Sequence, residues 1–262
     1  MKRIWWGIVL NLSIIACILS GCTQNLDASA EDSSIEMSAS LSSEDTSLNY
    51  RLYTPGSNEQ MPLVIAFHGY GDTEDPPFSK AVTAWTEPEN QEVRPCYVLA
   101  PVIADDDYIE FSRRERIYEQ VKNAVDSLIK EGKVDKSRVY VAGNSLGGMS
   151  TVEYTEKYHD SVAGALALCP AINYSAEAEN NLSKLIDVPI WFLHATNDNV
   201  IPVKVSREAV ENLKSMNAKD VHITEFTNEE MIAVGASYGY HEVDIAVMAQ
   251  DTYMKWLFEQ SK

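Results

Sequence analysis

Short, continuous runs of apolar residues alternate with helical patterns along most of this chain, and this alternation limits the available folds more than any other feature. The apolar runs cover residues 62–67, 96–100, 138–142, 162–168 and 189–193. Runs of this length are typical of strands that are buried on both faces. Parallel strands need long connections, which the helical segments between the runs supply. The sequence therefore predicts an α/β fold, a mostly parallel twisted sheet with helices on both faces.

The helical segments have apolar residues three and four positions apart. They cover 114–130, 145–157, 203–216 and 243–259. Two more strands are predicted near the ends of the region, an edge strand at 47–53 that alternates with a period of two, and a last strand at 222–226.

Composition narrows the function classes. Apolar residues make up 45% of the 262 residues, which is enough for one large buried core. The formal net charge is −18, from 21 Lys and Arg against 39 Asp and Glu. A chain this acidic lacks the cationic surface that neutralises phosphates, so no nucleic-acid partner is expected.

The first residues predict an export signal. Lys2 and Arg3 precede an almost wholly apolar run at 4–19, which is shorter than the roughly 20 residues of a membrane-spanning helix. The following Leu-Ser-Gly-Cys at 19–22 resembles the lipobox of bacterial lipoproteins. This resemblance implies removal of residues 1–21 and acylation of Cys22. The alternative is an anchor helix with an incidental cysteine.

Residues 23–50 contain eight Ser and no Lys or Arg. A segment with so few apolar residues cannot bury enough surface to offset the entropy of ordering. We therefore expect 22–47 to be a disordered tether and 48–262 to be the catalytic domain. Two or more acyl chains would anchor such a protein stably to a membrane. The expected location is the exported side of the cell membrane, facing away from the cytoplasm.

A Gly-x-Ser-x-Gly motif centred on Ser145 lies between the predicted strand 138–142 and the helix that follows. In this context the motif places a nucleophilic serine on a sharp strand-to-helix turn. Gly143 and Gly147 are expected because the backbone approaches too closely there for a Cβ. The helix amino terminus then directs N–H groups at the reacting carbonyl. The alternative is a glycine-rich turn with a capping serine.

A serine hydroxyl needs a base and a carboxylate, and in enzymes with this motif both follow the serine, the carboxylate first. Asp198 lies in the loop after strand 189–193, at the strand end where functional loops gather. His241 lies in the loop before the last helix. We expect Asp198 to orient the histidine ring and His241 to act as the base. The alternatives are an aspartate that stabilises its own turn and a surface histidine.

The other four histidines are not expected to act as the base. His68 and His194 end apolar strands and are expected to shape loops, His159 lies on the far side of the sheet, and His222 begins a strand. The loop at 68–72 has the sequence His-Gly-Tyr-Gly-Asp. It is expected to supply one backbone N–H of an oxyanion hole, from Tyr70, with Leu146 supplying the second. The alternative is an ordinary turn after a strand.

Several residues leave two interpretations open. Cys96 and Cys169 are expected as buried thiols, with a disulfide as the alternative. No CxxC spacing is present, so no zinc site is indicated. The aspartates at 105–107 form either a solvated loop or a cation site. Three aromatic residues are expected either to line an acyl pocket or to pack in the core: Trp85, Tyr108 and Tyr240.

Together these features resemble the α/β-hydrolase superfamily over residues 48–262. Within it they resemble bacterial secreted esterases of the polyhydroxybutyrate depolymerase, feruloyl esterase and predicted-peptidase group. The shared segments are 50–55, 62–69, 134–143, 145–148 and 188–191. The resemblance implies a Ser–His–Asp esterase without a cofactor. The stretch 170–188, where this fold usually carries a lid, is short and polar, so no large lid is expected.

The sequence departs from that group in three places. Leu146 stands where many relatives have Met, His159 replaces a frequent Pro, and the tract after His241 lacks the usual apolar and aromatic residues. The predicted function is hydrolysis of a carbohydrate-linked or short-chain acyl or aryl ester, on a small molecule or oligosaccharide. The alternatives are a serine peptidase resembling the prolyl oligopeptidase catalytic domain and a non-catalytic surface-binding lipoprotein.

Overall fold

An eight-stranded sheet with the order β1-β4-β6-β5-β7-β8-β9-β10 runs through the described part of the chain. The computed structural model describes residues 36–37, 41–43, 46–57, 59–72, 79–236 and 239–262. The predicted signal at 1–21, Cys22 and much of the predicted tether lie outside these residues. None of the helices in the described ranges is long and apolar enough to cross a membrane.

The strands from β5 to β10 are parallel to one another, whereas β4 is antiparallel to β6 and β1 is antiparallel to β4. The strands of this sheet are β1 (Glu36–Met37), β4 (Tyr50–Tyr53), β5 (Met61–Phe67), β6 (Tyr97–Pro101), β7 (Val134–Asn144), β8 (Gly164–Leu168), β9 (Ile190–Ala195) and β10 (Val221–Phe226). A separate antiparallel pair is formed by β2 (Leu41–Ser43) and β3 (Thr46–Leu48).

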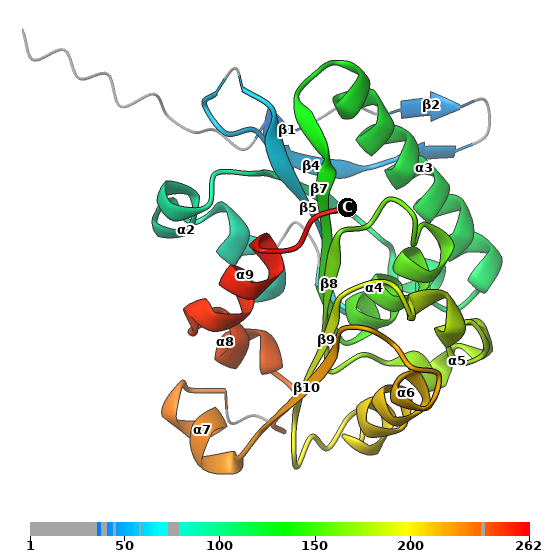
Figure 1. Ribbon diagram of the computed structural model, residues 1–262, viewed down its shortest axis with the longest axis vertical. Coiled ribbons are helices and arrows are strands. Elements are labelled where there is room, and N and C mark those ends of the chain that lie inside the picture. The colour runs from blue at the N-terminus through cyan, green and yellow to red at the C-terminus, as the bar shows by residue number, and fades with distance from the viewer. Residues whose placement is uncertain (1–35, 38–40, 44–45, 58, 73–78, 237–238) are drawn as a thin grey trace, which may run out of the picture. The chain divides into compact units, whose positions relative to one another are not determined.

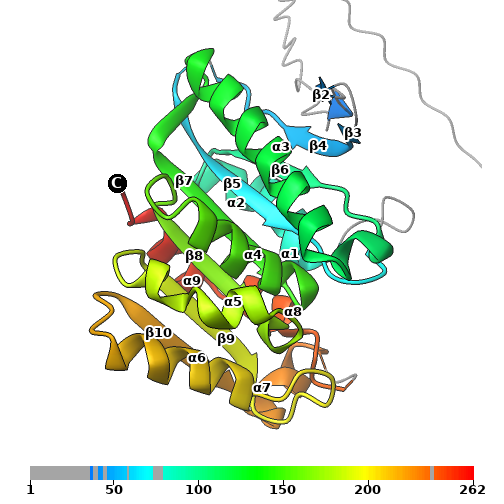
Figure 2. The same cartoon turned by 90° about the vertical axis from the view of Figure 1, so that its right-hand side faces the viewer.

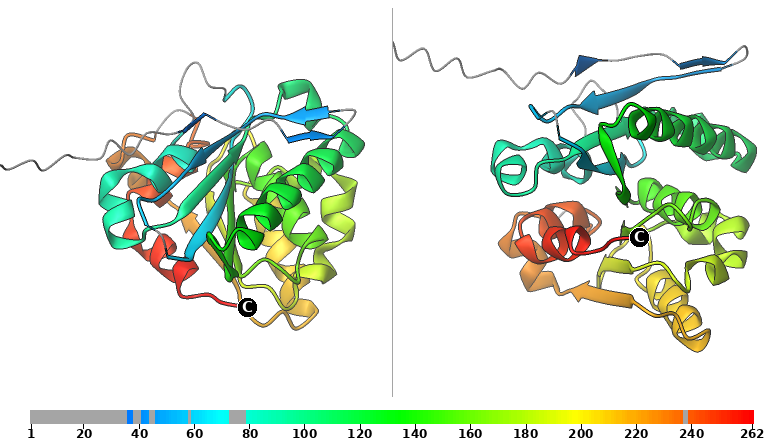
Figure 3. Two further views of the ribbon diagram at one scale, coloured as in Figure 1. Left: turned by 90° about the horizontal axis from the view of Figure 1, so that it is seen from above. Right: turned by 45° about the horizontal axis from the view of Figure 1, so that its top comes forward.

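Helices cover both faces of the sheet, as Figure 1 shows with the sheet seen nearly edge-on. One layer consists of α1 (Lys80–Thr83), α2 (Pro88–Val93), α8 (Val243–Met248) and α9 (Asp251–Phe258). The opposite layer consists of α3 (Phe111–Lys130), α4 (Leu146–Lys157), α5 (Ala176–Asn180) and α6 (Lys204–Ser215). This layer faces the viewer in Figure 2, and α7 (Asn228–Ala233) follows β10. Figure 3 shows the sheet between the two layers from two more directions. The predicted fold class is thereby confirmed.

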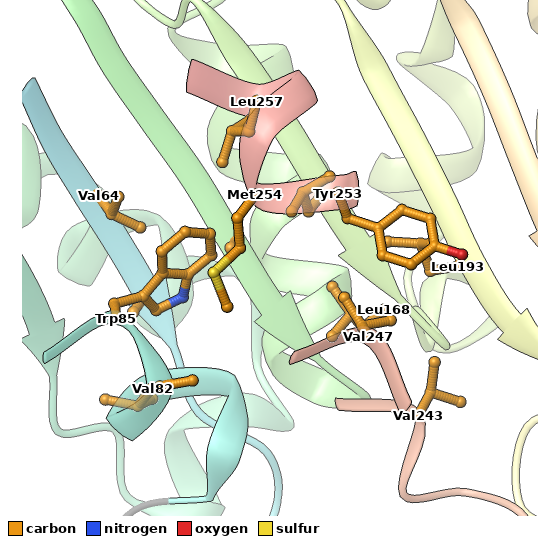
Figure 4. Packing of buried hydrophobic residues seen from close by; sticks show 14 of the residues in the cluster. Val64, Val82, Trp85, Leu168, Leu193, Val243, Val247, Tyr253, Met254 and Leu257 are labelled. Carbon is orange, nitrogen blue, oxygen red and sulfur yellow. The ribbon is translucent and has the colours of Figure 1, made fainter. Parts of the chain in front are cut away.

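The apolar strand residues form the core that their sequence pattern predicts. On one face, Val64 and Leu193 pack with residues of α8 and α9, and Figure 4 shows Met254 beside Trp85. Trp85 is fully buried and its ring stacks on that of Phe258. Trp85 is therefore a core residue, which decides between the two interpretations that its sequence left open.

The predicted helix 243–259 is wrong in one respect, because it is two helices, α8 and α9. Gln250 between them has extended backbone angles, with φ of −124° and ψ of 126°. A continuous helix would place Gln250 in the apolar stripe formed by residues such as Val243, Val247, Met254 and Leu257. The break instead leaves the Gln250 side chain exposed, so the cost of burying a polar amide is avoided.

The expectation of a tether without secondary structure at 22–47 does not fit its described residues. Residues 36–37 pair with β4, and 41–43 pair with 46–48. Strand pairing of this kind uses backbone N–H and C=O groups, which every non-proline residue carries. An edge strand such as β4 leaves these groups open to a partner whatever the partner's side chains are. The lack of apolar residues therefore did not exclude pairing here.

Candidate active site

Ser145 lies on the turn between β7 and α4 with φ of 60° and ψ of −118°. This backbone conformation is rare for residues other than glycine and costs on the order of 1–3 kcal/mol. Hydrogen bonds on both sides hold it in place. The Ser145 N–H donates to the carbonyl oxygen of Leu168 at 2.9 Å. The Ser145 carbonyl accepts from the N–H groups of Met149 at 3.0 Å and Ala171 at 3.1 Å.

Two glycines of the motif allow this turn to lie against β5. A Cβ at Gly143 would lie 2.4 Å from the carbonyl oxygen of Gly147. A Cβ at Gly147 would lie 2.3 Å from the carbonyl oxygen of Phe67. The clashing atoms belong to the backbone and cannot rotate away. The close approach that the motif predicts is therefore present at both positions.

Asp198 lies in the loop that follows β9, with its side chain fully buried. Its Oδ1 atom accepts the backbone N–H groups of Val200 at 2.8 Å and Ile201 at 2.9 Å. Its Oδ2 atom faces two histidines, His241 and His194. Oδ1 thus stabilises the turn, as in the alternative interpretation of this residue, whereas Oδ2 contacts the two histidines.

His241 lies between Asp198 and Ser145 and is hydrogen-bonded to both. Its Nδ1 atom is 2.7 Å from Asp198 Oδ2, and its Nε2 atom is 2.8 Å from Ser145 Oγ. The carbonyl of Gly239 accepts the N–H of Asn199 at 3.1 Å. This bond ties the loop that carries His241 to the loop that carries Asp198. The structure therefore places all three predicted side chains in one hydrogen-bonded chain.

The hydrogen-bond partners fix the direction of this chain. A carboxylate only accepts hydrogen bonds, so His241 Nδ1 carries the hydrogen and donates it to Asp198. His241 Nε2 then accepts from the Ser145 hydroxyl. Burial acts to raise the pKa of Asp198, but hydrogen bonds from His194, His241 and the Val200 N–H outweigh it and hold the pKa below its ordinary value. Asp198 is therefore ionised at neutral pH, and its negative charge faces the His241 ring.

Ser145 and His241 line a surface cleft of about 570 Å³. The described part of its wall exposes more apolar than polar surface, and it also carries polar and charged side chains. They include Asp72, Ser79, Lys80, Asn144, Glu242 and Asp244. The described wall does not include Trp85, Tyr108 or Tyr240. The interpretation of these three aromatic residues as the lining of an acyl pocket is not supported by the cleft.

Of the two predicted oxyanion donors, Tyr70 lines this cleft, and Leu146 directly follows Ser145, which also lines it. Leu146 is the first residue of α4, so its N–H has no acceptor within the helix. Tyr70 lines the cleft with its side chain exposed. Its neighbour Gly71 donates its N–H to Asp105 Oδ1 at 2.8 Å. Asp105 thus braces the 68–72 loop, a role that its place in a run of three aspartates did not indicate.

His68 and Tyr108 hold the start of the same loop. His68 Nε2 accepts the N–H of Ile103 at 2.9 Å, so its Nδ1 carries the hydrogen and donates to the carbonyl of Gly69 at 2.7 Å. Tyr108 donates its hydroxyl to the carbonyl of His68 at 2.6 Å. Burial lowers the pKa of His68, which keeps the ring neutral. His68 therefore shapes a loop, as its position at a strand end predicts.

Cys96 and Cys169 are buried thiols and form no disulfide with each other. The Cys169 Sγ atom lies 3.1 Å from Asn144 Oδ1, and burial raises the pKa of this thiol well above its ordinary value. Within the described ranges, Cys169, Asp198 and His241 form a group with metal-ligand atoms within 4.8 Å of one another. Asp198 and His241 are already bonded to each other, and a protonated thiol is a poor metal ligand.

Fold and site together define an α/β-hydrolase. Residues 102–234, about half of the chain, match the phospholipase/carboxylesterase family. The chain belongs to this family. The matching region includes Ser145 and Asp198 and ends before His241.

Similar proteins include several esterases. The bifunctional acetylxylan esterase/xylanase XynS20E of Neocallimastix patriciarum is 27% identical over 141 residues, which are 53% of this chain and 20% of that protein. A thermostable esterase of known structure is 27% identical, with a TM-score of 0.71 over 83% of this chain and 60% of its own. The chain thus spans only part of these relatives. Est1E from Butyrivibrio proteoclasticus, 18% identical, shares the fold with a TM-score of 0.61 over 84% of this chain and 98% of its own.

Proposed function

We propose that this chain is a serine esterase that hydrolyses carboxylic esters through Ser145, His241 and Asp198. The observation that carries the proposal is the hydrogen-bonded chain from Ser145 Oγ through His241 to the buried Asp198, at distances of 2.8 and 2.7 Å. Membership of the phospholipase/carboxylesterase family supports the same reaction class.

The reaction proceeds in two acyl-transfer steps. Ser145 Oγ attacks the carbonyl carbon of the ester while His241 Nε2 takes the hydroxyl proton. The tetrahedral intermediate collapses, the C–O bond to the alcohol breaks, and His241 returns the proton to the departing alcohol oxygen. Water then attacks the acyl-enzyme with the same base, which releases the acid and regenerates Ser145. The negative charge of Asp198 stabilises the imidazolium form of His241 in both steps.

The backbone N–H groups of Tyr70 and Leu146 are proposed to bind the oxyanion. One such donor is typically worth about 10²–10³ in rate. Since these roles belong to the backbone, changing either side chain is expected to matter less than changing Ser145.

The proposed substrate is a short acyl ester carried by a hydroxyl-rich alcohol such as a sugar. The polar side chains in the wall of the cleft, which include Asp72, Ser79, Lys80 and Asp244, offer hydrogen-bond partners to hydroxyl groups. The partial match to an acetylxylan esterase/xylanase supports this choice. The buried positions of Trp85 and Tyr108 argue against a built-in aryl pocket at those residues.

Turnover of p-nitrophenyl acetate tests the reaction class. We expect Ser145→Ala to lower kcat by about 10⁴-fold or more with an unchanged melting temperature. Ser215→Ala, at the exposed end of α6, serves as the matched control and should retain full activity. Turnover by the Ser145→Ala variant would contradict the assignment. A folded wild-type protein without any ester turnover would favour the surface-binding alternative.

A substrate panel tests the acyl and alcohol preference. Acetylated xylo-oligosaccharides, methyl ferulate and peptide p-nitroanilides should be compared at equal enzyme concentration. We expect the highest kcat/KM with the acetylated oligosaccharide. A preference for the peptide anilide would instead identify the serine peptidase.

We further propose that the protein is exported and anchored by acyl chains on Cys22, with 48–262 as its catalytic domain. The support is the basic, apolar and small-residue pattern of residues 2–22. Labelling with tritiated palmitate in a bacterial host tests the anchor. Cys22→Ser should abolish the label, while Cys17→Ser, inside the signal, should retain it. Equal labelling of both variants, or an unlabelled wild-type protein, would contradict the anchor.

A further inference from the structure

A second histidine lies behind the proposed triad. His194 is near the end of β9 and has no solvent exposure. Its Nδ1 atom is 2.8 Å from Ser206 Oγ on α6. Its Nε2 atom is 2.9 Å from the carbonyl oxygen of Ile201 and 3.3 Å from Asp198 Oδ2. The ring therefore connects a helix, the β9 loop and the carboxylate of the site.

The partners of the His194 ring determine its tautomer. A carbonyl oxygen and a carboxylate can only accept, so Nε2 carries the hydrogen. It donates this hydrogen to the Ile201 carbonyl, and Asp198 Oδ2 lies 3.3 Å from the same nitrogen. Nδ1 then accepts the hydroxyl hydrogen of Ser206, which is also fully buried. The ring is thus fixed at both nitrogens, with its N–H group held beside Asp198 Oδ2.

In the described part of the chain, the groups around the Asp198 carboxylate are all fixed in place. Oδ1 accepts the N–H groups of Val200 and Ile201, whereas Oδ2 accepts from His241 and lies 3.3 Å from His194 Nε2. Rotation of the carboxylate in either direction would break bonds at both oxygens. Because Oδ2 is also the atom that orients His241, the His194 donor acts on the same oxygen that the reaction uses.

Other charged groups near His194 are already paired. Glu225 on β10 lies opposite His194 in the strand register. Its carboxylate forms a bidentate pair with Arg207. Asp198 is the carboxylate whose oxygen lies 3.3 Å from His194 Nε2.

We propose that His194 is a positioning residue, which holds Asp198 Oδ2 in the plane where it orients His241. This inference rests on the proposed function of Ser145, His241 and Asp198. His194 touches neither substrate nor the reacting atoms. Its loss would let the carboxylate turn, and misplacement of a catalytic group by about 1 Å can cost about 10²-fold in rate.

Two amide substitutions form a matched test. The amide nitrogen of His194→Gln reaches the place of Nε2, whereas that of His194→Asn reaches only the place of Nδ1. We expect His194→Gln to stay within about threefold of the wild-type kcat for p-nitrophenyl acetate, and His194→Asn to lose about 10- to 100-fold. KM should change by less than about twofold in both, because the ring lies outside the cleft. His159→Asn, on the far side of the sheet, is the control and should leave kcat unchanged.

The downfield ¹H NMR resonance of the His241 Nδ1 proton gives a readout that needs no turnover. It should remain in His194→Gln and shift or broaden in His194→Asn. Equal kcat losses in the two variants, or an unchanged resonance and kcat in His194→Asn, would overturn the positioning role. If the wild-type protein showed this resonance but hydrolysed no ester, the proposed function would fail while the positioning role would remain.

Discussion

Backbone hydrogen bonds hold the residues of the proposed triad in place. Ser145 has its strained conformation fixed by bonds to Leu168, Met149 and Ala171. The residue before His241, Tyr240, also has a positive φ, of 54°. A strained backbone conformation persists only where the surrounding structure holds it in place, and such residues cluster at functional sites. The geometry of the site therefore depends on close packing around these residues.

Gly147 offers a direct test of that packing. Alanine favours helices, so Gly147→Ala in α4 would ordinarily stabilise by up to about 1 kcal/mol. Here a Cβ would lie 2.3 Å from the Phe67 carbonyl oxygen. We therefore expect a loss of several °C in melting temperature and of about 10²-fold in kcat/KM. Gly56→Ala, where a Cβ meets nothing within 4 Å, is the control. Wild-type stability and activity of Gly147→Ala would show that the turn does not need this approach.

The Gly-x-Ser-x-Gly pattern and its strand-to-helix context selected Ser145 as a candidate, and loop positions selected Asp198 and His241. The structure places these three side chains within hydrogen-bonding distance of one another. The contact between His194 and Asp198 could not be predicted, because it depends on how a four-residue turn folds back on its strand. His194 was expected only to shape a loop, and its hydrogen bond to Ile201 does this as well.

At the scale of elements, the 68–72 loop illustrates how one segment braces another. The loop after β5 is tied to the segment after β6 by bonds to Ile103, Asp105 and Tyr108. The apolar runs predicted both strands, but not which loops would touch. The order β6-β5-β7 places these two loops side by side at the same edge of the sheet.

The Asp105 contact should matter for rate. Asp105→Ala removes the carboxylate that accepts the Gly71 N–H, and the Tyr70 amide then loses part of its support. We expect kcat for p-nitrophenyl acetate to fall about fivefold, equivalent to about 1 kcal/mol. Asp106→Ala, exposed in the same run of aspartates, is the matched control and should retain the wild-type kcat. Equal effects of the two substitutions would contradict the bracing role.

At the scale of the whole molecule, stability is limited by a buried carboxyl on α4. Glu156 is 5% exposed, and its Oε1 atom has no hydrogen-bond partner among the residues that the structure describes. Burial, with a smaller effect of Glu153, raises the pKa of Glu156 from 4.5 to about 9. The folded protein therefore holds one more proton than the unfolded chain between these values. The free energy of unfolding must fall as pH rises through this window.

Glu156→Gln removes that dependence because an amide does not titrate in this range. The free energy of unfolding should be measured by urea denaturation at pH 6, 7 and 8. For each pH unit, we expect that of the wild-type protein to fall by about 1.4 kcal/mol more than that of the Gln variant. Glu115→Gln, a partly exposed carboxylate on α3, is the control and should follow the wild-type slope. If the free energy of unfolding changed with pH in the same way in the wild-type protein and in Glu156→Gln, Glu156 would be ionised in the folded state.

The central claim is that Ser145 is a nucleophile activated by His241. Reaction with a fluorophosphonate probe, followed by mass spectrometry of the digested protein, tests it most directly. We expect a single covalent adduct on Ser145 in the wild-type protein. We also expect a labelling rate lowered by about 10³-fold or more in His241→Ala. An adduct on another residue, no adduct, or labelling of Ser145 at the wild-type rate in the His241→Ala variant would contradict it.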